Sequence, residues 1–552
     1  MTDTLAAARA WLAQDPDPVT REELSALLAR VEAGDPEAVA DLDDRFGHRL
    51  EFGTAGLRGA LGAGPNRMNR VVVMRAAAGL GAWLGGSGRH VVVGHDARHR
   101  SDDFAADTAA VLTGAGHRVS VLPGPLPTPV LAFAVRELGA DAGVMVTASH
   151  NPPQDNGYKV YVGGGGEDAG AQIVAPADTE ISAAIDRVGP VGELPLGSEW
   201  TALGPEILER YLAAVAELAP EGPREVSATY TAMHGVGGRV LTAAVERAGF
   251  PRPTVVAEQF DPDPDFPTVA FPNPEEPGAM DLALRAGEAN GSDVVVANDP
   301  DADRLAVAVP GHGMLTGDEV GGLLAEYVLD HTSGERAVAA SIVSSTLLGR
   351  IARARGVHFD ETLTGFKWLA RAGGTRSRVF SYEEALGYCV GGDGGRPVAD
   401  KDGIGAALVL LSLAAAARQD GRTLLDLLDD QARRHGLHLT DQLSVRVADL
   451  SLLTWAMRRL RSHPPEAFGP FAVEGVDDFA AGHAGLPPTD ALRFRLAGGG
   501  RVTLRPSGTE PKLKAYAEIV LETAGDVGST RVRGARMLAE VMASVSTAVR
   551  DR

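Results

Sequence analysis

The sequence has few of the residues that stabilise small secreted domains or bind thiophilic metals. Cys389 is the single cysteine among 552 residues, which excludes an intramolecular disulfide framework and a cysteine-ligated metal cluster. Aromatic residues make up only 5% of the chain. The hydrophobic fraction of 44% and the charged fraction of 23% are nevertheless typical of globular proteins. The length therefore predicts about three to four domains, each with a core of its own.

Basic residues are also scarce. The chain has 52 Lys and Arg against 73 Asp and Glu, which gives a formal net charge of −21. This excess of negative charge argues against nonspecific binding to nucleic acid or to an anionic membrane. If the ligand is an anion, the basic residues that bind it must be concentrated locally. The sequence motifs do contain such residues, namely Arg58, Lys159, Arg304, Lys367, Lys401, Arg505 and Lys512.

Long apolar segments are missing as well. The longest, residues 403–417, is Ala-rich and shorter than the roughly 20 residues that a membrane-spanning helix needs. Residues 1–16 lack the basic start and the apolar core of a signal peptide. We therefore expect a cytoplasmic protein whose partners include neither a membrane nor a nucleic acid.

Strands and helices alternate along the chain. Short apolar runs at 90–94, 119–122 and 142–146 predict strands, and residues 102–115 predict a helix between the first two. This alternation is typical of βαβ units, whose sheets are mainly parallel. The pattern therefore predicts an α/β protein.

The first 48 residues differ from this pattern. Residues 4–13 and 21–32 predict two amphipathic helices. Thr20, with Glu23 three residues later, predicts a capping box at the start of the second helix. We expect these helices to form an appendage of the first domain.

The most informative stretch follows the apolar run at 142–146. Residues 147–161 read TASHNPPQDNGYKVY, in which Asn-Pro-Pro and Asp-Asn-Gly are strong turn signals. Ser149 therefore lies on a loop just beyond a strand end, where open α/β sheets bind ligands. His150 is adjacent to it, and Lys159 returns on the next extended segment. A hydroxyl with a base and a cation nearby suits covalent catalysis, although Ser and His in a turn are mostly solvated loop residues.

Three carboxylates follow another predicted strand, at 293–298. Asp299, Asp301 and Asp303 are each separated by one residue. Three negative charges so close together repel strongly, so the cluster makes sense around a cation. Hard oxygen ligands of this kind suit Mg²⁺. An EF-hand loop is excluded because its sixth position is Arg304 rather than glycine, and a solvated acidic turn is the alternative that is left.

Three further segments suit an anionic ligand less specifically. Residues 52–59, FGTAGLRG, contain glycines that let backbone N–H groups approach a ligand, but they are not a P-loop. Residues 362–368, TLTGFKW, place Lys367 between two aromatics that could equally belong to the core. Residues 505–512, RPSGTEPK, combine an arginine with hydroxyl and backbone donors. Taken alone, each of these segments could be a solvated turn.

Together and in this order, the motifs resemble those of the α-D-phosphohexomutases, the phosphoglucomutase and phosphomannomutase superfamily. TASHNP followed by DNGYK resembles the phosphoserine loop of that family, and GTAGLRG and RPSGTEP resemble two of its other motifs. The resemblance extends from about residue 48 to about residue 520. The N-terminal helices, DNGYKVY and EEALG are most similar to the phosphoglucomutase-2 type branch, which includes phosphopentomutases.

The resemblance implies a role for each motif residue. Ser149 carries the transferred phosphoryl group, and its phosphate completes a Mg²⁺ site formed by Asp299, Asp301 and Asp303. The implied catalytic residues are Ser149, His150, Arg58, Lys159 and Lys401. Either His150 or Lys401 transfers protons. The implied substrate-binding residues are Arg304, Thr364, Gly365, Lys367, Glu383, Arg505, Ser507, Gly508 and Thr509. Ala385 stands where the common sugar-binding motif GEESFG has serine, which leaves the identity of the sugar open.

The resemblance also implies the fold. We expect a four-domain phosphohexomutase architecture around one central cleft, with three doubly wound α/β domains that have mixed, mainly parallel sheets, and a C-terminal α+β domain able to close over the ligand. The expected parts are a helical appendage at 1–48, domain 1 at 49–205, domain 2 at 206–325, domain 3 at 326–440 and domain 4 at 441–552.

The implied reaction moves a phosphoryl group between the C1 and C6 hydroxyls of a hexose phosphate, through phosphoserine and a bisphosphate intermediate. Glucose 1-phosphate is the first choice of substrate, and mannose phosphate is a variant of it. The expected cofactor is Mg²⁺, and the expected activator is the sugar 1,6-bisphosphate.

The alternative mutase acts on ribose or deoxyribose 1-phosphate. A Mg-dependent sugar phosphatase would need no second phosphate clamp at Arg505. A sugar-phosphate-binding regulatory protein would not need every catalytic residue. The choice between monomer and homodimer is open.

Overall fold

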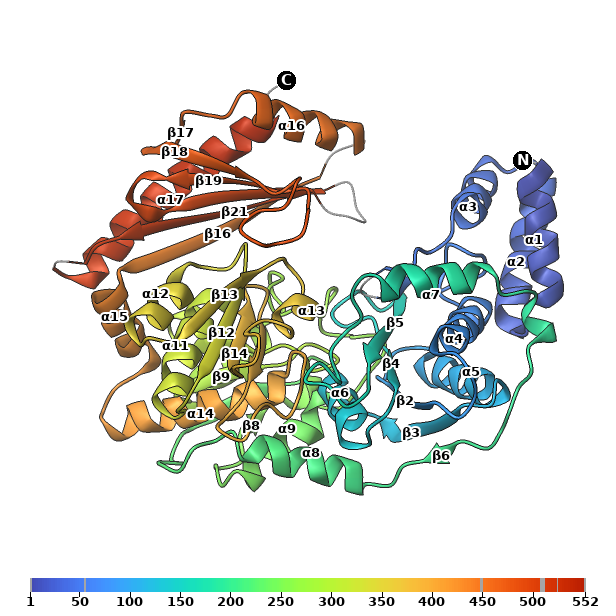
Figure 1. Cartoon of the computed structure of the whole chain (residues 1–552), viewed down its shortest axis with the longest axis horizontal. Coiled ribbons are helices and arrows are strands. Elements are labelled where there is room, and N and C mark those ends of the chain that lie inside the picture. The colour runs from blue at the N-terminus through green and yellow to red at the C-terminus, as the bar shows by residue number, and fades with distance from the viewer. Residues whose placement is uncertain (1, 54–55, 447–449, 507–511, 524, 551–552) are drawn as a thin grey trace. The chain divides into compact units, whose positions relative to one another are not determined.

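The structure, a computed structural model, forms two compact units (Figure 1). The described residues are 2–53, 56–446, 450–506, 512–523 and 525–550. Unit 1 comprises residues 1–314 and 387–416, and unit 2 comprises residues 315–386 and 417–552. The chain therefore returns to unit 1 after it has built the first part of unit 2.

Unit 1 begins with three helices, α1 (Thr2–Gln14), α2 (Pro18–Glu32) and α3 (Pro36–Gly47). The predicted capping box of Thr20 and Glu23 is wrong. Asp17 is the N-cap of α2, because Pro18 is preorganised for the first helical position and lacks the N–H that would be unsatisfied there. Thr20 instead donates a hydrogen bond to Asp15 Oδ2 at 2.7 Å.

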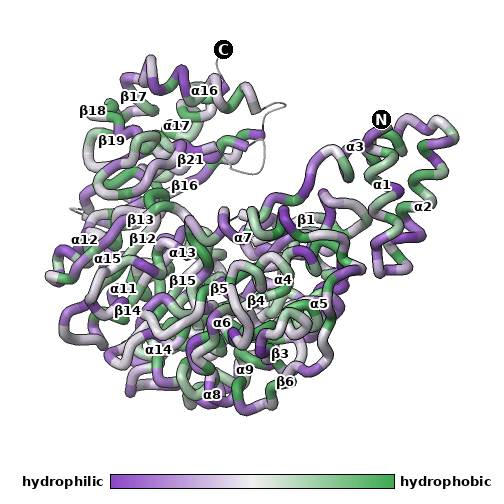
Figure 2. The backbone as a smooth tube through the Cα atoms, turned by 45° about the vertical axis from the view of Figure 1, so that its right-hand side comes forward, coloured by the Kyte–Doolittle hydropathy of each residue, from purple (hydrophilic) through white to green (hydrophobic). Residues whose placement is uncertain are grey.

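Helix α3 is absent from the sequence-based prediction, although its start carries the same signal as that of α2. Asp35 is its N-cap and Pro36 is its first residue. Glu23 of α2 forms an ion pair of 2.6 Å with Arg45 of α3. Hydrophobic and hydrophilic residues alternate along these helices, as Figure 2 shows, and the buried residues of α2 recur every three or four positions. The prediction of amphipathic helices in this region is confirmed.

The first sheet of unit 1 has six strands in the order β1-β5-β4-β2-β3-β6. They are β1 (Leu57–Ala60), β2 (His90–His95), β3 (Arg118–Pro125), β4 (Ala142–Val146), β5 (Asp155–Val162) and β6 (Thr201–Ala202). The helices of this region are α4 (Arg70–Leu84), α5 (Ser101–Gly114), α6 (Thr128–Glu137) and α7 (Ala177–Asp186), with a short 3₁₀ helix at Val191–Glu193. Strands β4, β2, β3 and β6 are parallel, while β5 is antiparallel to both of its neighbours. The expected mixed, mainly parallel sheet is confirmed.

The second sheet of unit 1 has five strands in the order β11-β10-β9-β7-β8. They are β7 (Ala228–Thr231), β8 (Thr254–Val255), β9 (Val294–Ala297), β10 (Ala306–Val309) and β11 (Gly313–Met314). The helices are α8 (Glu206–Ala216), α9 (Gly237–Arg247) and α10 (Asp281–Asn290), with a 3₁₀ helix at Ala257–Gln259. Strands β8, β7 and β9 are parallel, and β10 returns antiparallel to β9. The strand predicted at 293–298 corresponds to β9.

Residues 387–416 complete unit 1 with strand β15 (Gly387–Val390) and most of helix α14 (Gly403–Gln419). Tyr211 of α8 donates a hydrogen bond to Asp402 at 2.8 Å, and Asp402 accepts two further bonds from N–H groups in the first turn of α14. Gly403 is required by close packing, because a Cβ there would lie 2.2 Å from the carbonyl oxygen of Arg304. The start of α14 is thus hydrogen-bonded to α8 and packs against the loop that follows β9.

Unit 2 begins with an α/β region. Its three parallel strands are β12 (Arg336–Ser341), β13 (His358–Thr362) and β14 (Ser377–Glu383), with β12 between the other two. The helices are α11 (Gly317–Asp330), α12 (Leu347–Ala354), α13 (Phe366–Leu369) and α15 (Leu424–His435).

The rest of unit 2 is an antiparallel sheet with the strand order β16-β21-β20-β19-β18-β17. The strands are β16 (Leu437–Arg446), β17 (Ala467–Phe468), β18 (Phe471–Asp478), β19 (Leu492–Leu496), β20 (Arg501–Pro506) and β21 (Lys512–Leu521). The helices are α16 (Leu450–Ser462) and α17 (Val527–Arg550), with a 3₁₀ turn at Ala497–Gly499. Helix α17 packs against β16 and β21 (Figure 1). The expected C-terminal α+β domain is confirmed.

Among the described residues, no single helix combines the length and the apolarity needed to cross a membrane. Helices α14 and α15 meet that criterion only when they are taken together as a bent pair, on length and composition alone.

A buried polar cluster connects the two parts of unit 2. Glu518 on β21 accepts hydrogen bonds from Ser345 Oγ at 2.6 Å and from Thr346 N at 2.9 Å. It also lies 2.8 Å from His438 Nδ1 and 3.2 Å from Arg501 Nε. Burial disfavours the charged form of Glu518, but the His438 hydrogen bond and the Arg501 charge outweigh it and lower the pKa to about 2.

Replacement of Glu518 by glutamine is expected to destabilise the protein at neutral pH. The folded-state pKa lies below the ordinary value of 4.5, so the stabilisation is complete above pH 4.5 and is lost as the pH falls toward 2. The shift corresponds to about 3 kcal/mol. Scanning calorimetry should show a lower denaturation midpoint for Glu518→Gln at pH 7 and a smaller difference from the native protein near pH 2.5. Glu522→Gln, which changes an exposed side chain, is the control. Equal denaturation midpoints for the two variants at pH 7 would contradict the stabilising role of Glu518.

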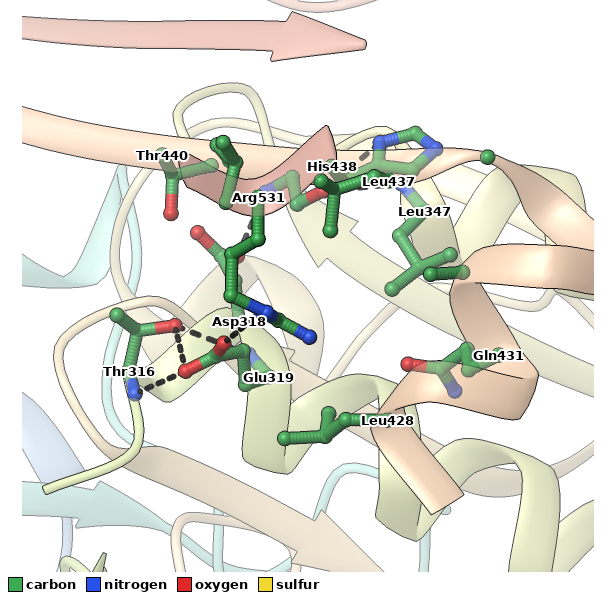
Figure 3. A pocket seen from close by; sticks show the side chains of 14 residues that line it. Thr316, Asp318, Glu319, Leu347, Leu428, Gln431, Leu437, His438, Thr440 and Arg531 are labelled. Carbon is green, nitrogen blue, oxygen red and sulfur yellow. Dashed lines mark hydrogen bonds and ion pairs between the residues drawn. The ribbon is translucent and has the colours of Figure 1, made fainter. Parts of the chain in front are cut away.

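A small pocket lies beside this cluster, between α11, α15, β16 and α17 (Figure 3). Thr316 and Glu319 form a reciprocal capping box at the start of α11. Glu319 also lies 3.4 Å from Arg531 of α17. None of the predicted site residues that the structure describes lines this pocket. The contact between Glu319 and Arg531 joins α11 to α17.

Candidate functional site

The serine loop, residues 147–154, follows β4 in the interior of the first sheet. All five residues of β4 are buried, and the strand lies between β2 and β5. Ser149 is 2% exposed and has a φ of 51°, in the left-handed region that few non-glycine residues adopt. Its N–H donates to Thr147 Oγ1 at 2.9 Å, which closes a tight turn. The hydroxyl is therefore fixed just beyond a strand end, as the sequence predicts.

The acidic triad, Asp299, Asp301 and Asp303, follows β9 in the second sheet. All three residues are fully buried, and one oxygen from each lies within 4.8 Å of the others. The chain turns tightly here, because Ala302 has a φ of 55°. The N–H of Arg304 donates to Asp299 Oδ1 at 3.1 Å, which closes the turn. The predicted clustering of the three carboxylates is thus present in the structure.

The serine loop and the acidic triad meet within unit 1. Ser149 Oγ donates to Asp299 Oδ2 at 2.9 Å and lies 3.2 Å from His150 Nδ1. Burial lowers the pKa of His150 well below its usual value, and the positive charges of Arg304 and Arg58 lower it further. His150 is therefore neutral at physiological pH, and a neutral imidazole can accept a proton.

Two lysines bind the carboxylates of the triad. Lys159 Nζ lies 2.7 Å from Asp301 Oδ2 and 3.0 Å from Asp303 Oδ2, and Lys401 Nζ lies 3.3 Å from Asp303 Oδ2. Lys159 reaches this position because β5 pairs with β4, where it lies opposite Met145. Burial disfavours the charged amine, but the carboxylates of Asp301 and Asp303 outweigh burial and raise the pKa of Lys159.

Two arginines flank the same site. Arg58 on β1 lies opposite Gly157 of β5, and its guanidinium donates to Asn151 Oδ1 at 3.1 Å. Arg304 Nε lies 3.9 Å from one carboxylate oxygen each of Asp299 and Asp303. Unit 1 thus brings together, around the Ser149 hydroxyl, all the catalytic and metal-binding residues predicted from the sequence, together with Arg304.

The acidic triad has spare acceptor atoms for a cation. Asp301 Oδ1 and Asp303 Oδ1 are buried and accept no hydrogen bond from any described residue. Burial and the negative charges of Asp301 and Asp303 raise the pKa of Asp299 well above its usual value. Burial also disfavours the charged forms of Asp301 and Asp303, but Lys159 outweighs burial and lowers the pKa of both, so the electrostatic cost of crowding three carboxylates falls on Asp299. A divalent cation with a preference for oxygen ligands fits this donor set and would offset that cost.

Sequence reasoning missed Thr128, the first residue of α6. Its Oγ1 donates to Asp301 Oδ2 at 2.6 Å, and its N–H donates to the carbonyl oxygen of Asp301 at 3.0 Å. Thr128 is fully buried and lies 173 positions from its partner. Because the partner is so distant in the chain, no local pattern could have indicated this contact.

Four of the predicted substrate-binding residues lie in the α/β region of unit 2. Thr364, Gly365 and Lys367 follow β13, and Glu383 ends β14. Because β13 and β14 are both parallel to β12, their C-terminal ends lie at one edge of the sheet. Gly365 has a φ of 107°, which favours glycine at the start of α13. Phe366 is 2% exposed and belongs to the core, in agreement with the alternative interpretation.

The last predicted motif is described only at its two ends. Arg505 lies on β20, opposite Lys514 of β21, and its side chain is half-buried. Ser507, Gly508 and Thr509 lie outside the described residues. Their predicted role in phosphate binding stays a prediction.

Four domain models of one family match the chain in order. They are described as phosphoglucomutase/phosphomannomutase alpha/beta/alpha domain I at residues 49–188, domain II at 209–313, domain III at 316–435, and the C-terminal domain at 460–524. Together the four matches cover well over half of the chain.

The chain is also similar over most of its length to individual proteins of known description. A Haemophilus influenzae protein described as "Probable phosphomannomutase" is 45% identical over 461 residues, which cover 82% of this chain and 93% of that one. A Schizosaccharomyces pombe protein described as "Probable phosphoribomutase" is 36% identical, with 92% of each chain covered. A Mus musculus glucose 1,6-bisphosphate synthase is 34% identical over 92% of this chain and 89% of its own.

A solved structure confirms the fold. The crystal structure of a phosphoglucomutase/phosphomannomutase family protein from Burkholderia thailandensis matches with a TM-score of 0.68 and 21% identity, and covers 91% of this chain and 98% of that one. The motif residues in unit 1, the four domain matches in order and the full-length relatives agree. The chain belongs to the phosphoglucomutase/phosphomannomutase family and is a phosphosugar mutase, an isomerase-type phosphotransferase.

Proposed function

We propose that this mutase exchanges the phosphoryl group between the C1 and C6 hydroxyls of a hexose, with glucose 1-phosphate and glucose 6-phosphate as the pair. The observation that carries the proposal is the 2.9 Å contact between the Ser149 hydroxyl and Asp299, because it places a nucleophile at an acidic metal-type site. Lys159 and Lys401 bind the same carboxylate cluster and supply the positive charge that a phosphoryl group needs.

The transfer runs in two balanced steps. In the first, the bond between phosphorus and Ser149 Oγ breaks while a bond forms between phosphorus and a sugar hydroxyl oxygen; a base takes the proton of that hydroxyl, and Ser149 Oγ gains a proton as it leaves. In the second, the bond between the other phosphorus of the sugar bisphosphate and its sugar oxygen breaks while a bond forms between that phosphorus and Ser149 Oγ; the Ser149 hydroxyl gives its proton to a base, and the freed sugar oxygen gains a proton. Neutral His150, 3.2 Å from Ser149 Oγ, is the better placed of the two predicted proton carriers.

The cofactor we propose is Mg²⁺, held by Asp299, Asp301 and Asp303 with the phosphate of Ser149. When bound, it would offset negative charge on the transferring phosphoryl group. The chain itself supplies Arg58, Lys159, Arg304 and Lys401 for the same purpose. These four cations keep a dianionic group close to three buried carboxylates, which would otherwise repel it.

Replacement of Thr128 by valine is expected to weaken Mg²⁺ binding by about 10–100-fold, because Asp301 loses the hydroxyl that orients it. Isothermal titration with MgCl₂ measures the change directly. Thr108→Val is the matched control, since Thr108 is also buried but its hydroxyl donates to the carbonyl oxygen of Phe104 within α5. Equal affinities for the native protein and Thr128→Val would contradict this role.

A pentose phosphate is the second candidate substrate. Ala385 replaces a hydroxyl that the common sugar-binding motif provides, and the Schizosaccharomyces pombe relative is described as a phosphoribomutase. The hexose proposal is supported by the Haemophilus influenzae relative, described as a phosphomannomutase, and by the mouse relative that makes glucose 1,6-bisphosphate. That bisphosphate is the activator we propose.

A coupled assay tests the proposal. Glucose 1-phosphate, mannose 1-phosphate and ribose 1-phosphate are compared with Mg²⁺ and catalytic glucose 1,6-bisphosphate present. We expect isomerisation without release of inorganic phosphate, and the highest kcat/KM for glucose 1-phosphate. A higher kcat/KM for ribose 1-phosphate would establish the pentose alternative. Release of inorganic phosphate in place of isomerisation would instead indicate a phosphatase.

A further inference from the structure

A single buried arginine, Arg98, donates hydrogen bonds to four backbone carbonyl oxygens, three in the serine loop and one at Asp155, the first residue of β5. Its Nη2 donates to the carbonyl oxygens of Ser149 at 2.6 Å and Asn151 at 2.5 Å. Its Nη1 donates to those of Pro152 at 2.8 Å and Asp155 at 3.2 Å. Because a guanidinium is planar and its donors point in fixed directions, it fixes these carbonyl groups relative to one another.

The guanidinium is itself held by further contacts. Its Nε lies 3.5 Å from Asp96 Oδ2, and the backbone N–H of Arg98 donates to Asp96 Oδ1 at 3.0 Å. The ring of Phe266 covers one face, with its centroid 4.9 Å from the guanidinium carbon. Arg98 is only 4% exposed. The side chain therefore cannot turn away without breaking several of these contacts at once.

Sheet register explains why Arg98 reaches the serine loop. Strands β2 and β4 are parallel neighbours, with His95 opposite Val146. One residue later, the N–H of Asp96 donates to the carbonyl oxygen of Val146 at 3.0 Å. The loop that carries Arg98 therefore leaves the sheet beside the loop that carries Ser149.

The backbone of Ser149 needs this support. A left-handed φ of 51° at a serine persists only when surrounding contacts hold it. Thr147 holds the N–H of Ser149, and Arg98 holds its carbonyl oxygen. The direction of the Ser149 hydroxyl is therefore set from both sides of the residue.

We propose that Arg98 is a positioning residue that aims the Ser149 hydroxyl, and the phosphoryl group it carries, at the acidic triad. The inference rests on the proposed function. Arg98 hydrogen-bonds the loop backbone rather than the Ser149 hydroxyl, so it acts through the loop. Lysine cannot replace it, because one ammonium group with three donors cannot bind four separate carbonyl oxygens in this fixed arrangement.

The chain contains a matched control, Arg224. Its guanidinium also donates to several backbone carbonyl oxygens, including those of Pro220 at 2.7 Å and Ala248 at 2.9 Å. It also lies over an aromatic ring, that of Phe250, at 4.7 Å. The segment it binds carries none of the predicted site residues. Arg98→Lys and Arg224→Lys therefore make the same chemical change in two different places.

The first measurement is hydrogen exchange of the protein without substrate. We expect faster exchange in the peptide covering residues 147–157 of Arg98→Lys and unchanged exchange there in Arg224→Lys. In the mutase assay, Arg98→Lys should lower kcat by about 100-fold and leave KM nearly unchanged, because a displaced nucleophile affects the chemical step. The ³¹P resonance of phospho-Ser149 should also shift in Arg98→Lys alone. Unchanged exchange and native kcat in Arg98→Lys would overturn the proposal.

Two further results keep the test decisive. If Arg98→Lys does not fold, Asp96→Asn removes the negative charge and one of the two acceptor oxygens beside Arg98, and faster exchange in the same peptide is again expected. Unchanged exchange in that variant would count against the proposal. If the native protein has no mutase activity on any sugar, the proposed function fails, whereas the exchange comparison still decides whether Arg98 orders the serine loop.

Discussion

Replacement of Ser149 by alanine is expected to lower mutase turnover by roughly four orders of magnitude or more, because both transfer steps pass through this oxygen. The hydroxyl is the group that meets the acidic triad, 2.9 Å from Asp299. The coupled assay measures the loss of turnover. Incubation with ³²P-labelled glucose 1,6-bisphosphate, followed by denaturation, measures the loss of protein-bound phosphate.

Ser412→Ala is the control for this experiment. Ser412 is as well buried as Ser149, lies on α14 in the same unit and donates only to the carbonyl oxygen of Leu408. We expect native turnover and native labelling in this variant. Full activity in Ser149→Ala, or stable labelling at another residue, would contradict the assignment of Ser149 as the phosphoryl carrier.

Replacement of Asp303 by asparagine is the second change with a large expected effect. Asp303 contacts both Lys159 and Lys401 and contributes a carboxylate oxygen to the acidic triad. Removing its charge weakens the proposed metal site and leaves two buried cations with less compensation. We expect kcat to fall on the order of 10³-fold and saturable Mg²⁺ binding in calorimetric titration to disappear.

A matched control and a metal-depletion experiment accompany this variant. Asp281→Asn removes an exposed carboxylate on α10 and should leave both Mg²⁺ binding and turnover native. Treating the native protein with EDTA should abolish turnover, and MgCl₂ should restore it. Native Mg²⁺ affinity in Asp303→Asn, or full activity in EDTA, would show that the triad does not hold the catalytic cation.

The parts of the site that could be predicted from the sequence are those encoded in short stretches of chain. A buried strand, a turn signal and a reactive side chain lie together in the serine loop, and the same holds for β9 and the acidic triad. Their meeting could not be deduced from spacing alone, because Ser149 and Asp299 are 150 positions apart. Family resemblance supplied that connection, and the geometry of unit 1 agrees with it.

The residues that were missed have partners far away in the chain. Arg98 contacts carbonyl groups more than 50 positions further on, and Thr128 contacts Asp301. From sequence, each is an unremarkable polar residue next to a helix or strand. The error at α2 has a different cause: Thr20 and Glu23 match a capping pattern, but Asp17 and Pro18 form a stronger start signal three residues earlier.

The return of residues 387–416 to unit 1 has a consequence for the order in which the protein can mature on the ribosome. The acidic triad and the serine loop have been synthesised by residue 314, but Lys401 has not. At typical rates of translation, the segment that carries Lys401 follows roughly 5–20 s later. During that interval Asp303 lacks its contact with Lys401 and has only those with Lys159 and Arg304 among the contacts described above, so the acidic triad is complete before its cationic partners are.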